Sequence, residues 1–312
     1  MLSRRNVRIK VMQMLYTMSR DKSVDLSTIL SRYRENVDKT FELFLFNLLL
    51  LMKISAYARI DAKRKKSKHL PSEEDRKFTP KLADNPLMAS LLQNQALFRL
   101  FNKLELESYF EEDQIRRFYT EFAEKEEYKS FIDKPDNTAQ DFKDIILLLY
   151  KTCINNETFI ELIKDQYPLW EEDKSLVVGT IKKTVKALPS EEDFFKAYEP
   201  TAETIEEFGK TLLLKVNKSE SELLEIITPS LKNWDADRVA VIDMILIKMA
   251  ITEFISFESI PTKVTLNEYV ELAKVYSTDK SKDFVNGILD RLVKQLTDNG
   301  QIKKSGRGLV GN

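Results

Sequence analysis

The sequence predicts an all-α protein, and three observations lead to this prediction. Apolar residues recur at helical spacing through most of the 312 residues, whereas the alternation typical of strands is scarce. Glycine is rare, with seven residues in the whole chain. Prolines fall mainly in polar gaps between the periodic segments, where they begin or end helices. We therefore expect about a dozen helices and no sheet.

The first two thirds of the chain predict helices of uneven length. An apolar stripe at i, i+4, i+7, i+8 and i+11 from Val7 to Met18 predicts a helix over residues 5–18. A short helix over 26–37 precedes a long one that begins at Asp38 and runs to the basic residues after Arg59. Residues 67–86 are loop-like. Further helices are expected over 87–103, 112–131, 139–165 and 172–187.

The last third is the most regular part of the sequence. Ser219 and Glu222 have the spacing of a capping box, and Asp235 is a candidate cap for a helix that ends near Phe257. A polar turn over 277–281 separates the last two helices, and the basic residues after Asn299 predict a flexible tail. The helices expected here span residues 204–216, 223–231, 235–257, 262–276 and 282–296.

Composition excludes several classes of enzyme. The first glycine is Gly179, so the preceding residues cannot form a glycine-rich phosphate loop or a dinucleotide-binding turn. His69 and Cys153 are the only histidine and cysteine, which argues against a zinc site, a histidine-based triad or an intrachain disulfide. Cys153 is expected to be a small buried apolar residue, and the apolar run Phe41–Ile54 a buried core helix rather than a membrane span. We expect no catalytic residue, no metal and no cofactor.

The first helix carries chemistry suited to RNA. Arg5, Arg8 and Tyr16 follow one flank of its apolar stripe, and residues 1–20 contain no acidic residue although the whole chain has a net charge of −1. Arginine grips phosphates with two hydrogen bonds, and an exposed tyrosine offers a face on which an unpaired base stacks. The alternative is a solvated basic flank with Tyr16 half-buried in the core.

Motifs near both ends of the chain resemble the NusB family of transcription antitermination factors. Over about 205–297 the resemblance is continuous, through Asn233–Val239, Asn267 with Glu268, and Phe284–Gly287. At the N-terminus a short motif of paired arginines, a third arginine and Gln-x-Leu-Tyr is matched by Arg4, Arg5, Arg8, Gln13, Leu15 and Tyr16.

The resemblance implies a NusB-like helical bundle, enlarged by additional helices, that is cytoplasmic and has no enzymatic activity. Its members bind single-stranded boxA-type RNA together with NusE, a small-subunit ribosomal protein, and support ribosomal RNA transcription through the antitermination complex of RNA polymerase. The resemblance places RNA contacts at Arg4, Arg5, Arg8, Tyr16, Tyr276, Ser277, Lys280, Ser281, Lys282, Phe284 and Asn286. We expect Arg5→Ala with Arg8→Ala to weaken RNA binding without unfolding the protein.

The length of the chain departs from the family pattern, in which about 140 residues are common. The resemblance divides the chain into the arginine-rich helix (1–20), an additional helical region (21–200), the C-terminal core (201–298) and the basic tail (299–312). The additional region enlarges the surface that faces NusE, mediates homo-oligomer formation or supports the core, and the sequence does not choose between these roles. The rival function is a protein–protein scaffold that keeps the fold and has lost specific RNA binding.

Overall fold

The computed structural model describes residues 1–231 and 239–309, and it divides the chain into two compact units. The terminal unit consists of Leu2–Val37 with Pro200–Asn312, and the middle unit consists of Met1 with Asp38–Glu199. Each unit therefore has a core of its own. The described residues contain helices and no strand, which confirms the all-α prediction.

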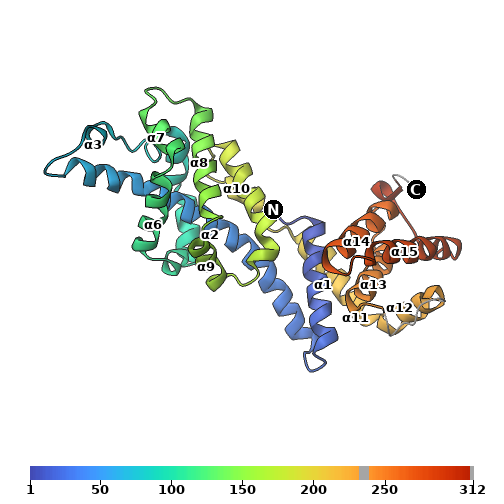
Figure 1. Cartoon of the computed structure of the whole chain (residues 1–312). Helices are drawn as coiled ribbons and strands as arrows, with labels where there is room; N and C mark the ends of the chain where they lie inside the picture. The colour runs from blue at the N-terminus through green and yellow to red at the C-terminus, as the bar shows by residue number, and fades with distance from the viewer. Residues whose placement is uncertain (232–238, 310–312) are drawn as a thin grey trace. The chain divides into compact units, whose positions relative to one another are not determined.

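The terminal unit packs its helices around α13 (Val241–Ser256). This helix contacts α1, α11, α14 and α15 (Figure 1). Most of its side chains from Ile245 to Phe254 are buried. A helix that is apolar on nearly every face is stable only when neighbours cover it on all sides. The surrounding elements are α1 (Arg4–Arg20), the first turns of α2 (Leu26–Lys66), the π-helix η3 (Glu203–Lys210), α11 (Thr211–Lys218), α12 (Glu220–Ile227), η4 (Thr228–Leu231), α14 (Thr262–Tyr276), α15 (Ser281–Asp298) and η6 (Gly306–Leu309).

The middle unit is built around the remaining turns of α2. Its elements after α2 are α3 (Glu73–Lys77), α4 (Pro86–Leu92), α5 (Gln95–Lys103), η1 (Leu106–Tyr109), α6 (Glu112–Ala123), α7 (Glu126–Asp133), α8 (Ala139–Cys153), α9 (Glu157–Gln166), α10 (Trp170–Ala187) and η2 (Phe194–Tyr198). The buried residues of α2 from Leu43 to Ala62 form one apolar cluster with those of α4 to α10. Cys153 belongs to this cluster, which confirms its expected burial, and burial raises the pKa of its thiol.

Helix α2 is one continuous helix, whereas a short and a long helix were predicted from its sequence. The predicted break between Val37 and Asp38 does not exist, because no proline or glycine interrupts residues 26–66. One stretch of α2 is long and apolar enough to cross a membrane, and 72% of that stretch is buried inside the protein. A core helix of this kind passes the same test, so burial accounts for its apolar character.

Three predicted helices are each divided in two. Asn94 ends one helical pattern and caps the next, because its side-chain oxygen accepts a hydrogen bond from the backbone N–H of Leu97. Asn156 does the same for Phe159 at the start of α9. The third division lies between α6 and α7, near Lys125. A side chain that caps a helix within an apolar pattern leaves the hydrophobic period almost unchanged, so the period alone does not reveal it.

Two local predictions concern helix caps in the terminal unit. Ser219 precedes α12, but its side chain makes no capping hydrogen bond, so the predicted capping box is wrong. The predicted cap at Asp235 lies outside the described residues.

Close packing requires glycine at two described positions of this unit, Gly209 in η3 and Gly308 beside the Glu258 carbonyl. A Cβ atom on Gly209 would lie 2.0 Å from the hydroxyl oxygen of Tyr33 and 2.3 Å from Cγ1 of Val7. The Tyr33 hydroxyl passes over this position and donates a hydrogen bond to the Ile205 carbonyl at 3.0 Å. Gly209 therefore lets α1, α2 and η3 meet beside the arginine-rich start of α1.

Candidate RNA-binding surface

Helix α1 begins at a fully formed cap that fixes the position of its arginines. The Ser3 hydroxyl accepts a hydrogen bond from the backbone N–H of Asn6, and the Asn6 side chain accepts one from the backbone N–H of Ser3. The first helical residues are then Arg4 and Arg5, with Arg8 one turn later. Because residues three or four apart share a helix face, Arg4 and Arg8 lie on neighbouring parts of the surface of α1.

Arg8 is buried, which corrects its predicted place on an exposed flank. Its side chain is 3% exposed and forms two hydrogen bonds with the Glu253 carboxylate, at 2.9 Å from Nε and 2.5 Å from Nη2. The guanidinium also lies over the rings of Phe208 and Tyr269, at 5.1 and 5.7 Å from their centres. In this structure Arg8 therefore joins α1 to α13 and does not reach solvent.

The environment of Glu253 explains why a charged pair is tolerated there. Thr265 and Tyr269 donate hydrogen bonds to the same carboxylate at 2.7 and 3.0 Å, so both of its oxygens are satisfied. Burial by itself would lower the pKa of the Arg8 guanidinium, but the hydrogen bond and charge of Glu253 outweigh burial and raise that pKa. Arg8 is consequently charged at any physiological pH.

Arg5 is exposed and Arg4 is half-buried over the Phe208 ring, and each is paired with one carboxylate. Arg4 contacts Glu203 at 3.0 Å, and its side chain is 37% exposed. Arg5 lies 3.1 Å from Glu268 on α14, with 48% of its side chain exposed. Such surface pairs are each worth about 0–1 kcal/mol, so a phosphate can replace the carboxylate at small cost. Both arginines are therefore accessible cations, and their partners are residues that sequence reasoning had not assigned to this surface.

Tyr16 lies on the same helix, three turns after Arg5. Its side chain is 41% exposed, so the half-buried alternative does not describe it. The surrounding positions Met12, Met14 and Leu15 are buried and hold this part of α1 against the core. An exposed ring on a fixed helix is the arrangement that base stacking needs.

The turn between α14 and α15 contains both structural and exposed residues. Ser281 is 1% exposed, and its hydroxyl donates to the Asp243 carboxylate at 2.7 Å. The same oxygen lies 2.9 Å from the Ser277 hydroxyl and accepts a hydrogen bond from the backbone N–H of Thr278. The Ser281 hydroxyl is thus a buried link that holds the turn to α13, and its predicted exposure to RNA is corrected.

The remaining predicted residues of this turn lie at its surface. Lys280 and Lys282 are exposed on either side of the α15 N-terminus, and Tyr276, Phe284 and Asn286 are half-buried. The Asn286 amide donates to Asp290 at 3.3 Å. The α15 N-terminus and the two lysines favour an anion, and the exposed Asp279 and Asp283 beside them offset part of that positive charge.

Helix α14 connects the two groups of candidate residues. Glu268 on α14 pairs with Arg5, and the helix ends at Tyr276, eight residues later. Eight residues of helix span about 12 Å, the length of a few nucleotides of single-stranded RNA. The structure therefore brings the accessible arginines and the α14–α15 turn into one compact unit. Arg8 and Ser281 belong to the same unit, but both are buried and do not form part of its exposed surface.

Comparison with known proteins identifies the family of the domain that carries the α14–α15 turn. The NusB family model matches residues 173–294, from within α10 to within α15. The chain carries a NusB family domain. The match contains Glu253, Glu268 and the α14–α15 turn, and it begins after α1 in the sequence. Helix α1 nevertheless packs against α13 in the same compact unit, so its arginines lie beside the NusB match.

Curated relatives of the NusB domain are transcription antitermination proteins by name. The protein from Salinibacter ruber, named transcription antitermination protein NusB, is 43% identical over 105 residues, which are 34% of this chain and 66% of the relative. Proteins of the same name from Chloroherpeton thalassium and Natranaerobius thermophilus are 50% identical over 78 residues and 44% identical over 84 residues. These alignments cover 25% and 26% of this chain, and 37% and 60% of the respective relatives. The chain thus spans less than two thirds of their lengths.

No solved structure matches the chain significantly. The names of the three relatives describe transcription antitermination proteins, and the family model is that of the NusB family. The chain, at 312 residues, is much longer than the 122 residues that the family model matches, so it is an extended variant.

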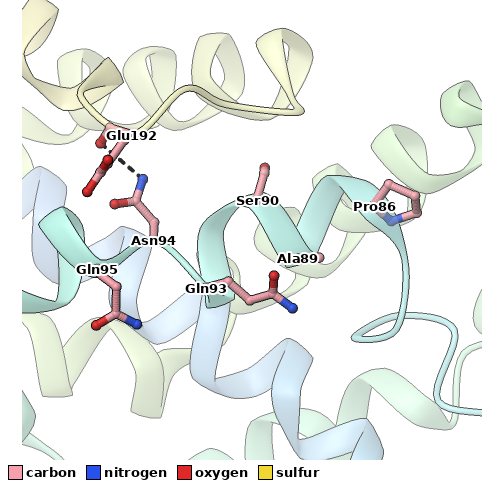
Figure 2. Close-up of a pocket in the computed structure, with 7 residues that line it drawn as sticks. All are labelled: Pro86, Ala89, Ser90, Gln93, Asn94, Gln95 and Glu192. Carbon is pink, nitrogen blue, oxygen red and sulfur yellow. Dashed lines mark hydrogen bonds between the residues drawn. The ribbon is translucent and has the colours of Figure 1, made fainter.

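Most of the middle unit lies outside the NusB match, and its surface contains a pocket. This pocket of about 470 Å³ lies between α4, α5 and the segment before η2. It is lined by polar side chains, and the Asn94 amide donates to the Glu192 carbonyl at 3.1 Å (Figure 2). Its residues are Pro86, Ala89, Ser90, Gln93, Asn94, Gln95 and Glu192. No described group of three His, Cys, Asp or Glu residues has the arrangement of a metal site.

Proposed function

We propose that the chain is an RNA-binding transcription antitermination factor that binds boxA-type single-stranded RNA together with NusE in the cytoplasm. The observation that carries this proposal is the accessible pair Arg4 and Arg5 with Tyr16 on α1, fixed beside the NusB domain. Phosphates bind the two arginines in place of Glu203 and Glu268, and an unpaired base stacks on Tyr16. The activity is binding, and no covalent step is involved.

The α14–α15 turn supplies the second half of the proposed surface. Lys280 and Lys282 attract the RNA backbone to the α15 N-terminus, while Tyr276, Phe284 and Asn286 provide half-exposed groups for bases. Ser277 and Ser281 hold the turn through their hydrogen bonds and act as positioning residues. Arg8 likewise positions α1 through Glu253.

We propose that the predicted divisions of the chain have separate roles. The N-terminal helix and the C-terminal core form the RNA-binding part, and the additional helical region supports assembly with partner proteins. NusE and, through it, the RNA polymerase complex are proposed as partners on the basis of the family resemblance and the names of the relatives. Support for ribosomal RNA transcription belongs to the same proposal.

A test of this function measures fluorescence anisotropy of a labelled boxA-type RNA and of a scrambled RNA, each with and without NusE, at two salt concentrations. We expect preference for the boxA-type RNA, tighter binding with NusE, and affinity that falls with salt because phosphates are neutralised. Arg5→Gln should weaken binding more than Arg20→Gln, the matched loss of an exposed arginine at the other end of α1. Equal weak binding of both RNAs, unaffected by NusE, contradicts the proposal.

The second candidate function is a protein–protein scaffold. It is favoured by the ion pairs that Arg4 and Arg5 form with the carboxylates of Glu203 and Glu268. A surface that had lost RNA binding would still retain these ion pairs for stability. The scaffold predicts that Arg5→Gln leaves RNA binding unchanged, whereas the RNA-binding function predicts a loss.

A further inference from the structure

The end of α2 and the segment after it form a strongly basic surface in the middle unit, far in sequence from the NusB match. Residues 59–77, here called the basic arm, contain eight Lys or Arg residues and four Asp or Glu residues. Figure 1 shows the last turns of α2 and α3 at one end of this unit. The sequence alone favours a solvated helix face here, because half as many acids as bases leaves a modest net charge.

Burial changes this charge balance. Two of the four acids, Asp61 and Asp75, are 2% and 6% exposed. The Asp61 carboxylate binds Arg64, Lys65 and the Tyr119 hydroxyl at 2.9, 2.9 and 3.2 Å. Half of the acids are therefore buried, where they hold the arm together, while most of the cations are exposed.

The solvent-facing side of the arm is consequently dominated by cations. Seven of them are exposed, against two exposed acids, Glu73 and Glu74. The exposed cations are Arg59, Lys63, Arg64, Lys66, Lys68, Arg76 and Lys77. Cations near a helix C-terminus are stabilised by the helix dipole, which explains those of the last turn of α2. It does not explain Lys68, Arg76 and Lys77, which come after α2 has ended.

Part of the arm is held rigidly enough to present these charges. Lys68 binds both oxygens of Asp75 at 2.9 Å, and Asp75 also accepts a hydrogen bond from the backbone N–H of Ser72 at the start of α3. These contacts lower the pKa of Asp75 to about 2, with the Lys68 hydrogen bond as the largest cause. Lys65 lies over the Phe78 ring at 3.7 Å.

We infer that the basic arm is a sequence-independent binding surface for the phosphate backbone of single-stranded RNA. Lys63, Lys66 and Arg76 are the residues assigned to phosphate contact, because they are exposed and take no part in the ion pairs that build the arm. Arg64 adds positive charge to the surface while it keeps its ion pair with Asp61. The arm goes beyond the proposed boxA-type recognition, since it binds RNA outside any recognition element.

RNA is favoured over a lipid surface by the distribution of apolar side chains. A helix that lies on a membrane needs a broad apolar face. In residues 59–77, all of which the structure describes, the exposed large apolar side chains are Ile60 on α2 and Leu70 in the following loop. Two isolated side chains on different elements do not form such a face.

The test compares two full-length variants that lose the same charge. In the arm variant Lys63, Lys66 and Arg76 become Gln; in the control variant Lys103, Lys151 and Lys182, exposed residues elsewhere in the middle unit, become Gln. The probe is a labelled single-stranded RNA of about 40 nucleotides without a boxA-type element, titrated at several salt concentrations. Three lost phosphate contacts should reduce the slope of log K against log salt by about two. The ratio of the RNA affinity of the wild type to that of the arm variant should then fall by about 16-fold between about 50 and about 200 mM salt.

The outcomes separate this inference from the proposed function. A reduced slope in the arm variant, with less than half of that reduction in the control variant, supports the arm. An unchanged slope, equal reductions in both variants, or no binding of this RNA by the wild type overturns it. If the arm variant loses binding to phosphatidylserine vesicles while its RNA binding is unchanged, the inference is overturned in favour of a lipid-binding surface. Preference of the wild type for boxA-type over scrambled RNA, measured separately, tests the proposed function alone.

Discussion

Arg8 and Glu253 form a buried ion pair with two hydrogen bonds, and it joins the first helix of the chain to the centre of the NusB domain. The two residues are 245 positions apart in the sequence. Through this pair, α1 is held in a fixed orientation on α13, and that orientation decides which way Arg4 and Arg5 face. The pair thus acts on the proposed RNA surface without facing solvent.

Loss of Arg8 should destabilise the terminal unit. Arg8→Ala leaves the Glu253 carboxylate buried without its cation, which costs about 3–5 kcal/mol when one partner of a buried pair is removed. This corrects the expectation that Arg5→Ala with Arg8→Ala leaves the protein folded. Denaturant unfolding of Arg8→Ala and Arg5→Ala checks it, and the Arg5 variant should lose less than about 1 kcal/mol. Similar small losses in both variants would contradict the buried-pair account.

The double variant Arg8→Met with Glu253→Leu should be more stable than either single variant. Two apolar side chains remove both charges at once, and replacement of a whole buried pair is often neutral in stability. Thr265 and Tyr269 would then lose their hydrogen-bond acceptor, so the double variant should remain less stable than the wild type. The measurement is the same unfolding experiment, analysed as a double-mutant cycle.

Removal of the Glu203 carboxylate should strengthen RNA binding. Glu203→Gln frees Arg4 from its 3.0 Å ion pair and removes a negative charge that repels incoming phosphate. We expect tighter binding of boxA-type and scrambled RNA alike, and a salt slope steeper by up to about one, since one more cation releases counterions. The matched control is Glu207→Gln on the same π-helix, an exposed residue for which no such gain is expected. Weaker binding by Glu203→Gln would refute the competition between carboxylate and phosphate.

Substitution of Gly209 should destabilise the terminal unit because the added Cβ overlaps neighbouring atoms. Gly209→Ala forces apart the Tyr33 hydroxyl and Val7 Cγ1, and overpacking of this kind costs about 1–3 kcal/mol. Tyr33→Phe combined with Gly209→Ala removes the closest atom and should recover part of the loss. Thermal unfolding of the two single variants and the double variant measures this, and additive losses would show that the two residues are not coupled.

Substitution of Gly287 should have the opposite effect on stability. A Cβ atom there meets nothing within 4 Å, and alanine is favoured over glycine inside a helix by about 0.5–1 kcal/mol. We therefore expect Gly287→Ala to raise the midpoint of thermal unfolding. If its RNA affinity also falls, a partner approaches α15 at this point. If the midpoint falls instead, the space beside Gly287 is filled.

The positions of most helices are predictable from sequence, and the exceptions have local causes. The apolar periodicity located α1, α10, α14 and α15 to within a few residues. It failed at Asn94 and Asn156, where one side chain ends a helix and starts another without changing the period. It also placed a break at Asp38, although a polar residue on a continuous helix needs no break when neither proline nor glycine accompanies it.

The residue types of the candidate site are readable from sequence, but their exposure is not. A helical wheel places Arg5 and Arg8 on one flank, yet one is at the surface and the other in the core. The difference arises from Glu253, which binds Arg8 from a helix more than 240 residues away, and from Thr265 and Tyr269, which donate hydrogen bonds to the Glu253 carboxylate. The same reasoning applies to Asp61, because its burial removes a negative charge from the exposed side of the basic arm.

The sequence by itself determined the all-α class, the NusB resemblance and the absence of glycine-dependent nucleotide chemistry, because these depend on periodicity, local motifs and composition. The tertiary structure decided which charged side chains face solvent, how α1 is anchored to α13, and where glycine is required. Those properties depend on contacts between residues far apart in the chain. The spacing of residues within one helix does not show which residues of other helices will contact it, because those contacts form only when the helices pack together.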